Sequence, residues 1–178
     1  MPKIKNFDLL RSPLKGTILI EASAGTGKTY TISGLFLRLI LEKSLSVNEI
    51  LVVTFTRAAT GELRDRIRNN LREALEAFSL GCSDDEFFNA LINKYKNREE
   101  ILKRVNEALR DFDEASVFTI HGFCQKILRE NAFECGSFFD TELISDQGPL
   151  IQEIIEDFWR EHFYKGTPLF VHYAINKY

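Results

Sequence analysis

The feature that most constrains this chain is a run of small residues between an apolar segment and an amphipathic one. Thr17-Ile18-Leu19-Ile20 predicts a buried strand, and the apolar spacing from Lys28 to about Glu42 predicts a helix. The residues between them, 21–27, are mostly small and suit a tight loop. Strand, loop and helix in this order are typical of α/β folds with parallel strands.

The small-residue run carries the pattern of a phosphate-binding loop, Ala22-x-x-x-x-Gly27-Lys28-Thr29, with Ala22 where the usual pattern has glycine. Glycines let backbone N–H groups form a concave arc around an anion. The helix that follows directs its first amides at the same anion. Lys28 would supply a charge at the β- and γ-phosphates, and the Thr29 hydroxyl would hold Mg²⁺.

Further along the chain, the apolar runs 50–55 and 116–120 predict a second and a third strand. With the first strand, 50–55 would complete a parallel βαβ unit. A long amphipathic helix should follow 50–55 and stop at Gly81. Four further helices are expected, two short ones capped by Ser83 and Asn97, one after His121 and an acidic amphipathic one after Pro149. The stretch with Gly136, Phe138 and Phe139 predicts a loop.

The polar residues that follow the second and third predicted strands are candidates for ligand contacts. Open α/β sheets bind ligands at the carboxyl ends of their strands. Hydroxyls at Thr54, Thr56 and Thr119 could bind phosphates, and Phe55 could stack on a base or belong to the core. Arginines at 57, 64, 68 and 72 lie along one stripe of a helix, as a basic face or as a solvated one.

Composition excludes several classes of protein. The 178 residues include 44% hydrophobic and 28% charged residues with a net charge of −3, which is typical of a globular domain. We find no run long enough to span a membrane and no signal peptide. Three cysteines without paired spacing indicate reduced thiols in a cytoplasmic protein. Neither Asp113-Glu114 nor Asp84-Asp85-Glu86 ends a strand, so neither qualifies as the carboxylate that polarises an attacking water.

Three segments together resemble motifs I, Ia and Ic of the UvrD/Rep-type superfamily 1 DNA helicases. They are Leu19 to Thr29, Val52 to Thr60 and Val117 to Cys124, in that order and spacing. The resemblance is strongest to the exodeoxyribonuclease V beta-subunit family, the RecB helicase–nucleases, and runs from about Asp8 to about Phe163.

The resemblance implies an ATP-driven motor that unwinds duplex DNA from its ends and is joined to a nuclease. It implies that ATP and Mg²⁺ bind Ala22, Ser23, Ala24, Gly25, Thr26, Gly27, Lys28 and Thr29, with Lys28 and Thr29 as catalytic groups and Thr29 as the metal ligand. It implies that single-stranded DNA contacts Thr54, Phe55, Thr56, Ala58, Ala59, Thr119, His121 and Gly122. Its partners would be DNA and the gamma and alpha subunits of the exodeoxyribonuclease V complex.

The expected fold is an incomplete α/β P-loop core of the RecA-like, three-layer type with parallel strands, plus helices of an insertion. Residues 1–135 would form a partial first motor domain, and 136–178 the start of a helical insertion subdomain. Relatives are far longer, so we expect an N-terminal piece without appreciable ATPase of its own. A small-molecule P-loop kinase and a non-catalytic interaction module are the alternative interpretations.

Overall fold

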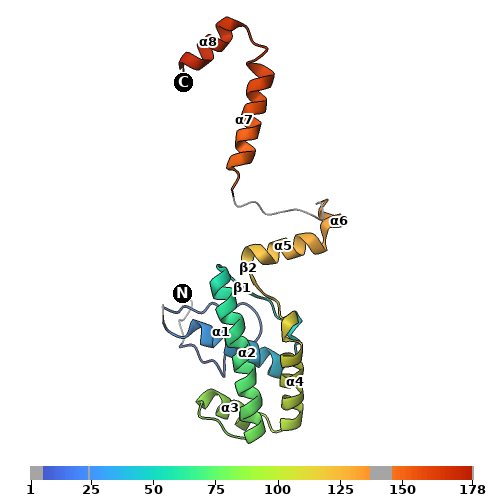
Figure 1. The fold of residues 1–178 in the computed structure, drawn as a ribbon. Helices are drawn as coiled ribbons and strands as arrows, with labels where there is room; N and C mark the ends of the chain where they lie inside the picture. Colours follow the sequence, from blue (N-terminus) through green and yellow to red (C-terminus); the bar gives the residue numbers. More distant parts are fainter. Residues whose placement is uncertain (1–5, 24, 137–145, 178) are drawn as a thin grey trace. The chain divides into compact units, whose positions relative to one another are not determined.

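The computed structural model describes residues 6–23, 25–136 and 146–177, which divide between two compact units, Met1–Glu130 and Asn131–Tyr178 (Figure 1). The first unit contains α1 (Lys28–Lys43), the 3-10 turn η1 (Val47–Glu49), β1 (Val52–Thr54), α2 (Arg57–Leu80), α3 (Glu86–Lys94), α4 (Arg98–Arg110), the 3-10 turn η2 (Phe112–Glu114), β2 (Val117–Thr119) and α5 (Ile120–Glu130). The second contains α6 (Ala132–Cys135), α7 (Gly148–His162) and α8 (Pro168–Lys177).

The sheet of the described residues has two parallel strands, β1 and β2. Their register pairs Val52 with Val117 and Thr54 with Thr119. These are the second and third predicted strands, shortened to three residues each, and α2, α3 and α4 form the connection between them. The parallel pairing therefore joins residues that lie 65 positions apart in the sequence.

The predicted buried strand at 17–20 is wrong. This segment has no regular secondary structure, and the side chains of Ile18 and Leu19 are 43% and 84% exposed. A strand needs a neighbour for its backbone N–H and C=O groups, and the two-stranded sheet of the described residues leaves 17–20 unpaired. The predicted βαβ unit with 50–55 is therefore absent as well, because an apolar run does not specify its partner.

The core lies in the first unit, where α1 packs against α2 and α4 packs against both. Most of the expected helix boundaries are confirmed. The Thr56 hydroxyl accepts a hydrogen bond from Ala59 N at 3.1 Å and begins α2. Gly81, at φ 82°, ends α2 by donating its N–H to Ala77 O. The largest fully buried side chains include Phe36, Leu37, Ile67, Leu71, Phe78, Phe88, Leu91, Val105 and Phe112.

The two short helices differ in how well their caps were predicted. Asn97 caps α4 as expected, since its Oδ1 accepts from Glu100 N at 3.3 Å. Ser83 does not cap α3; Asp85 does, accepting from Phe87 N at 2.7 Å. Three consecutive capping residues, 83–85, precede the helix, and the one adjacent to its first apolar turn provides the cap.

In the second unit, the predicted acidic amphipathic helix is confirmed as α7. Its apolar side chains, including Ile151, Ile154 and Phe158, are all exposed. The aromatic rings of Trp159, Phe163 and Phe170 pack in series, with centroids 4.0 and 5.3 Å apart. Gly136 ends α6 at φ 63°, whereas the loop expected at Phe138 and Phe139 lies outside the described residues. Among the helices described here, none has the length and apolar content needed to span a bilayer.

Candidate nucleotide and nucleic-acid site

The loop before α1 folds as a tight bend. Gly25 and Gly27 have φ values of 78° and 80°, a conformation that L side chains rarely adopt. Thr26 closes the bend, because its N–H and its hydroxyl both donate to Ser23 O, at 3.4 and 2.7 Å. Residues 21–23 and 25–28 are exposed, so the bend is open to solvent and α1 begins directly after it. Ala24 lies outside the described residues.

Lys28 is folded back onto this bend. Its Nζ donates hydrogen bonds to Ala22 O at 3.0 Å and to Ser23 O at 2.6 Å. Thr29, the candidate Mg²⁺ ligand, follows in the first turn of α1 and is partly buried. The loop thus places an ammonium group and a hydroxyl at the N-terminus of a helix, where an anion is favoured.

The predicted DNA contacts meet at the carboxyl ends of the two strands. The ladder sets Thr54 beside Thr119, and Phe55, Thr56, His121 and Gly122 follow directly. Phe55 is 87% exposed, and His121 is also exposed. The open position of Phe55 excludes a core role within the described residues.

Two helices begin at this edge, and a threonine contacts the first turn of each. Thr56 caps α2, whose first residues include Ala58 and Ala59. The Thr119 hydroxyl accepts from Gly122 N at 3.0 Å at the start of α5. The N-termini of α2 and α5 both carry positive partial charge, so this edge of the sheet is favourable for anions.

Sequence reasoning missed Thr60 as a member of this site. Its hydroxyl lies 2.6 Å from that of Thr54 and donates to Thr56 O at 2.9 Å. Thr60 lies four residues after Thr56, and this spacing was the available signal. Serine and threonine hydroxyls in helices can donate a hydrogen bond to the carbonyl oxygen four residues earlier.

Part of the arginine stripe is engaged within the chain. Arg64 and Arg68 lie over the ring of Phe112, at 5.6 and 5.4 Å from its centroid. Both also approach the Asp113 carboxylate, and Arg64 donates to Asp113 O at 3.1 Å. These contacts favour a structural role for the two residues, while Arg57 is exposed at the start of α2.

The loop and the strand ends form separate groups of residues. The hydrogen bonds of residues 22–28 stay within the loop and α1, and in the described part of the chain none reaches Thr54 or Thr119. The first turn of α1 is instead tied to α3, because the Tyr30 hydroxyl donates to the Asp85 carboxylate at 3.1 Å.

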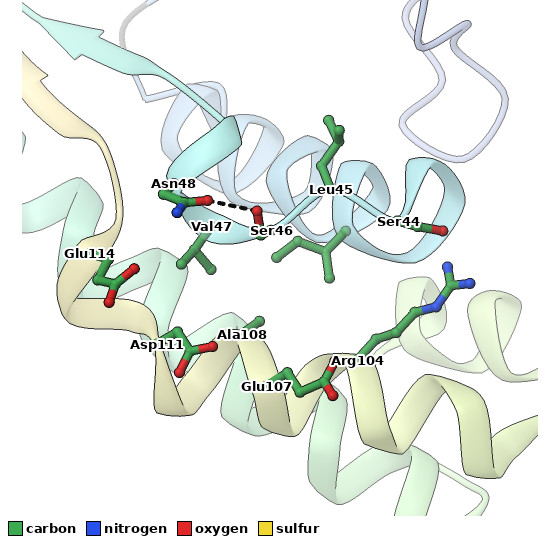
Figure 2. Close-up of a pocket in the computed structure, with 11 residues that line it drawn as sticks. Ser44, Leu45, Ser46, Val47, Asn48, Arg104, Glu107, Ala108, Asp111 and Glu114 are labelled. Carbon is green, nitrogen blue, oxygen red and sulfur yellow. Dashed lines mark hydrogen bonds between the residues drawn. The ribbon is translucent and has the colours of Figure 1, made fainter.

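A cavity of about 180 Å³ lies away from all predicted site residues, between residues 44–48 and α4 (Figure 2). Glu107, Asp111 and Glu114 line one side of it, and the hydrogen-bonded pair Ser46 and Asn48 lies on the other. Across the described residues, no three His, Cys, Asp or Glu side chains are grouped as metal ligands would be.

Comparison with known proteins connects these features to a family. Residues 6–168 match the family model described as UvrD/REP helicase N-terminal domain. The chain is 46% identical over 168 residues to the Escherichia coli (strain K12) protein named RecBCD enzyme subunit RecB, a match covering 90% of this chain and 14% of that protein.

Relatives of the same name occur in other bacteria. The Haemophilus influenzae protein is 46% identical over 167 residues, covering 85% of this chain and 14% of its own length. The Mycolicibacterium smegmatis protein is 36% identical over 166 residues, covering 90% of this chain and 15% of its own length. The chain thus spans about one seventh of the length of these relatives.

Proposed function

Because this chain belongs to the UvrD/REP helicase N-terminal domain family, we propose that it is the ATP- and DNA-binding part of an ATP-dependent DNA helicase and exonuclease of recombination and double-strand break repair. The observation that carries the proposal is the exposed bend formed by 21–23 and 25–27, with Gly25 and Gly27 at positive φ and Lys28 at the start of α1. The similarity to proteins named RecB supports the same conclusion.

In this proposal, residues 22–29 bind the phosphates of ATP. The ammonium of Lys28 exchanges the carbonyl oxygens of Ala22 and Ser23 for β- and γ-phosphate oxygens, and the amides at the start of α1 donate to the same group. Mg²⁺ prefers few protein ligands besides phosphates and waters. The single hydroxyl of Thr29 fits that requirement.

Single-stranded DNA would cross the carboxyl ends of β1 and β2. Phe55 is exposed enough to stack on a base, and bases stack on aromatic rings without sequence preference. Thr54, Thr56, Ala58, Ala59, Thr119, His121 and Gly122 would contact the strand around it. The first amides of α2, at Arg57 and Ala58, would donate to a backbone phosphate.

We further propose that residues 1–135 belong to an incomplete three-layer RecA-like core and that 136–178 begin a helical insertion. The exposure of Ile18 and Leu19, and of Leu51 and Val53 on one face of β1, supports this interpretation. In the longer protein, the gamma and alpha subunits of the exodeoxyribonuclease V complex would be the partners.

Titration of the chain with a fluorescent ATP analogue and Mg²⁺ tests the nucleotide half of this proposal. We expect saturable binding that weakens at least about tenfold in Lys28→Ala, since a charge-assisted contact to phosphate is lost. The matched control is Lys43→Ala, an exposed lysine at the other end of α1. Equal binding by Lys28→Ala and the native chain would instead favour an interaction module without nucleotide chemistry, and phosphate transfer to nucleosides would favour a kinase.

A further inference from the structure

Phe55 is displayed to solvent in an unusual setting. It is 87% exposed, although large aromatic side chains gain most from burial. It follows the last residue of β1 and precedes the cap of α2, so its two neighbours belong to different elements. The conformation of residues 54–56 therefore decides where its ring points.

A chain of hydroxyl hydrogen bonds holds both neighbours of Phe55. The Thr60 hydroxyl donates to Thr56 O at 2.9 Å and lies 2.6 Å from the Thr54 hydroxyl. Thr54 Oγ1 also lies 3.2 Å from Thr56 O. If Thr54 donates to Thr60 and Thr60 donates to Thr56 O, each proton is used once and no oxygen lacks a partner.

This chain of bonds is anchored at both ends. Thr54 is fixed by the ladder with Thr119, and Thr60 lies in the helix α2, one turn after Thr56. Thr54 and Thr60 are both partly buried, which shields their contact from competing water. Phe55 is thus held between two rigid elements while its own ring remains open.

We infer that Thr60 is a positioning residue that holds Phe55 ready to stack on a base of single-stranded DNA. The inference rests on the proposed function of the strand ends and adds to it a residue that does not touch DNA. A side chain already held in its binding conformation loses less entropy when the ligand arrives. Removing the Thr60 hydroxyl should therefore weaken stacking by Phe55 and leave the phosphate contacts unchanged.

The test is fluorescence anisotropy of a labelled oligo-dT strand with the 178-residue chain at several salt concentrations. Thr60→Val removes the hydroxyl at nearly constant shape, and we expect about fivefold weaker binding. Thr60→Ser keeps the hydroxyl and should bind as the native chain does. Because phosphate contacts set the dependence of the dissociation constant on salt, that dependence should be the same for Thr60→Val and the native chain.

A double-mutant cycle decides whether Thr60 acts through Phe55. In the Phe55→Ala background, Thr60→Val should cause no further loss. A full additional loss there, or native affinity of Thr60→Val alone, would overturn the inference while leaving DNA binding itself in place. Failure of the native chain to bind the strand would instead contradict the proposed function.

Circular dichroism separates a folding defect from a binding defect. Thr60→Val should keep the helix content and the cooperative unfolding transition of the native chain. Should it lose that transition, Thr60→Ala removes the same hydroxyl with a residue that favours helix, and it is judged by the same cycle with Phe55→Ala.

Discussion

Arg38 shows how one buried charge can attach an irregular segment to a helix. It lies in α1 with its side chain 3% exposed. One nitrogen donates to Leu9 O at 2.6 Å and to Ser12 O at 2.9 Å, and two others donate to the Glu42 carboxylate. Burial opposes ionisation of Glu42, yet the hydrogen bonds from Arg38 and Lys94 hold its pKa below the ordinary value.

Replacing Arg38 with methionine should destabilise the chain by about 3 kcal/mol, because the carbonyl oxygens of Leu9 and Ser12 lose this donor and the Glu42 carboxylate keeps only Lys94. Urea unfolding at pH 7 measures this difference. Arg110→Met is the control, since Arg110 forms an exposed pair with Asp111, and its unfolding midpoint should hardly move. A small change in Arg38→Met would mean that the segment around Leu9 is held by packing alone.

The ion pair between Arg38 and Glu42 also predicts that the stability of the chain falls at acidic pH. The lowered pKa of Glu42 means that its contribution is present above the ordinary carboxyl pKa and is lost as the pH falls through the lower value of the folded state. The difference in unfolding free energy between the native chain and Arg38→Met should therefore shrink at acidic pH.

At the scale of elements, most helices followed from the sequence, whereas α6, α8 and the absence of the predicted strand at 17–20 did not. The periodicity of α1 and α2, the glycine after α2 and the asparagine before α4 are local signals, and the structure confirms them. The run 17–20 had the right composition for a strand, but pairing depends on distant residues that a local pattern does not identify. For the same reason the sequence does not decide between a basic and a solvated face for Arg64 and Arg68, because their partners Phe112 and Asp113 lie far away along the chain.

In the candidate site, residue identities came from motif spacing, whereas their relations required the fold. The spacing identified the loop at 22–29 and the two strand ends. The pairing of Thr54 with Thr119 and the role of Thr60 depend on register and on side-chain direction, which the sequence does not encode locally. The assignments of these residues to ATP and DNA stay predictions until binding is measured.

The contact between α1 and α3 leads to a prediction about alkaline pH. Burial, and then the charge and hydrogen bond of Asp85, raise the pKa of Tyr30 to about 12. A tyrosine with a raised pKa stabilises the fold fully below its unfolded value near 10, and this contribution is lost as the pH rises from 10 to 12.

Tyr30→Phe should therefore unfold with a shallower loss of stability between pH 10 and 12 than the native chain. Near pH 7 it should lose about 0.5–1 kcal/mol for the missing hydrogen bond. Thermal unfolding across this pH range measures both effects, with Tyr164→Phe, an exposed tyrosine of the second unit, as the control. If the native chain, Tyr30→Phe and Tyr164→Phe all lose stability equally between pH 10 and 12, Tyr30 does not contribute through Asp85.

At the scale of the whole molecule, we compare the proposed phosphate-binding loop with the carboxylate that ATP hydrolysis would also need. The described residues contain the bend that we propose for phosphates, but the acids Asp113 and Glu114 lie in η2, before β2 rather than after it. Residues 55–57 and 120–122, which follow the two strands, include no carboxylate. These two segments therefore supply no carboxylate that could orient a water for attack on the γ-phosphate.

The purified 178-residue chain should accordingly bind ATP and yet hydrolyse it no faster than Lys28→Ala does. Release of inorganic phosphate, followed with and without single-stranded DNA, measures this. Turnover stimulated by DNA and lost in Lys28→Ala would show that the chain contains a complete hydrolytic site, contrary to our expectation.

The short ladder between β1 and β2 has a consequence for variation in this protein. Its three residue pairs bring together the strand ends that carry Phe55 and His121, two exposed residues that lie far apart in the sequence. Sliding one strand by a single residue would turn its side chains to the opposite face. Substitutions within the ladder, such as at Val117, are therefore expected to weaken the proposed binding of single-stranded DNA, although Val117 itself would not contact the DNA.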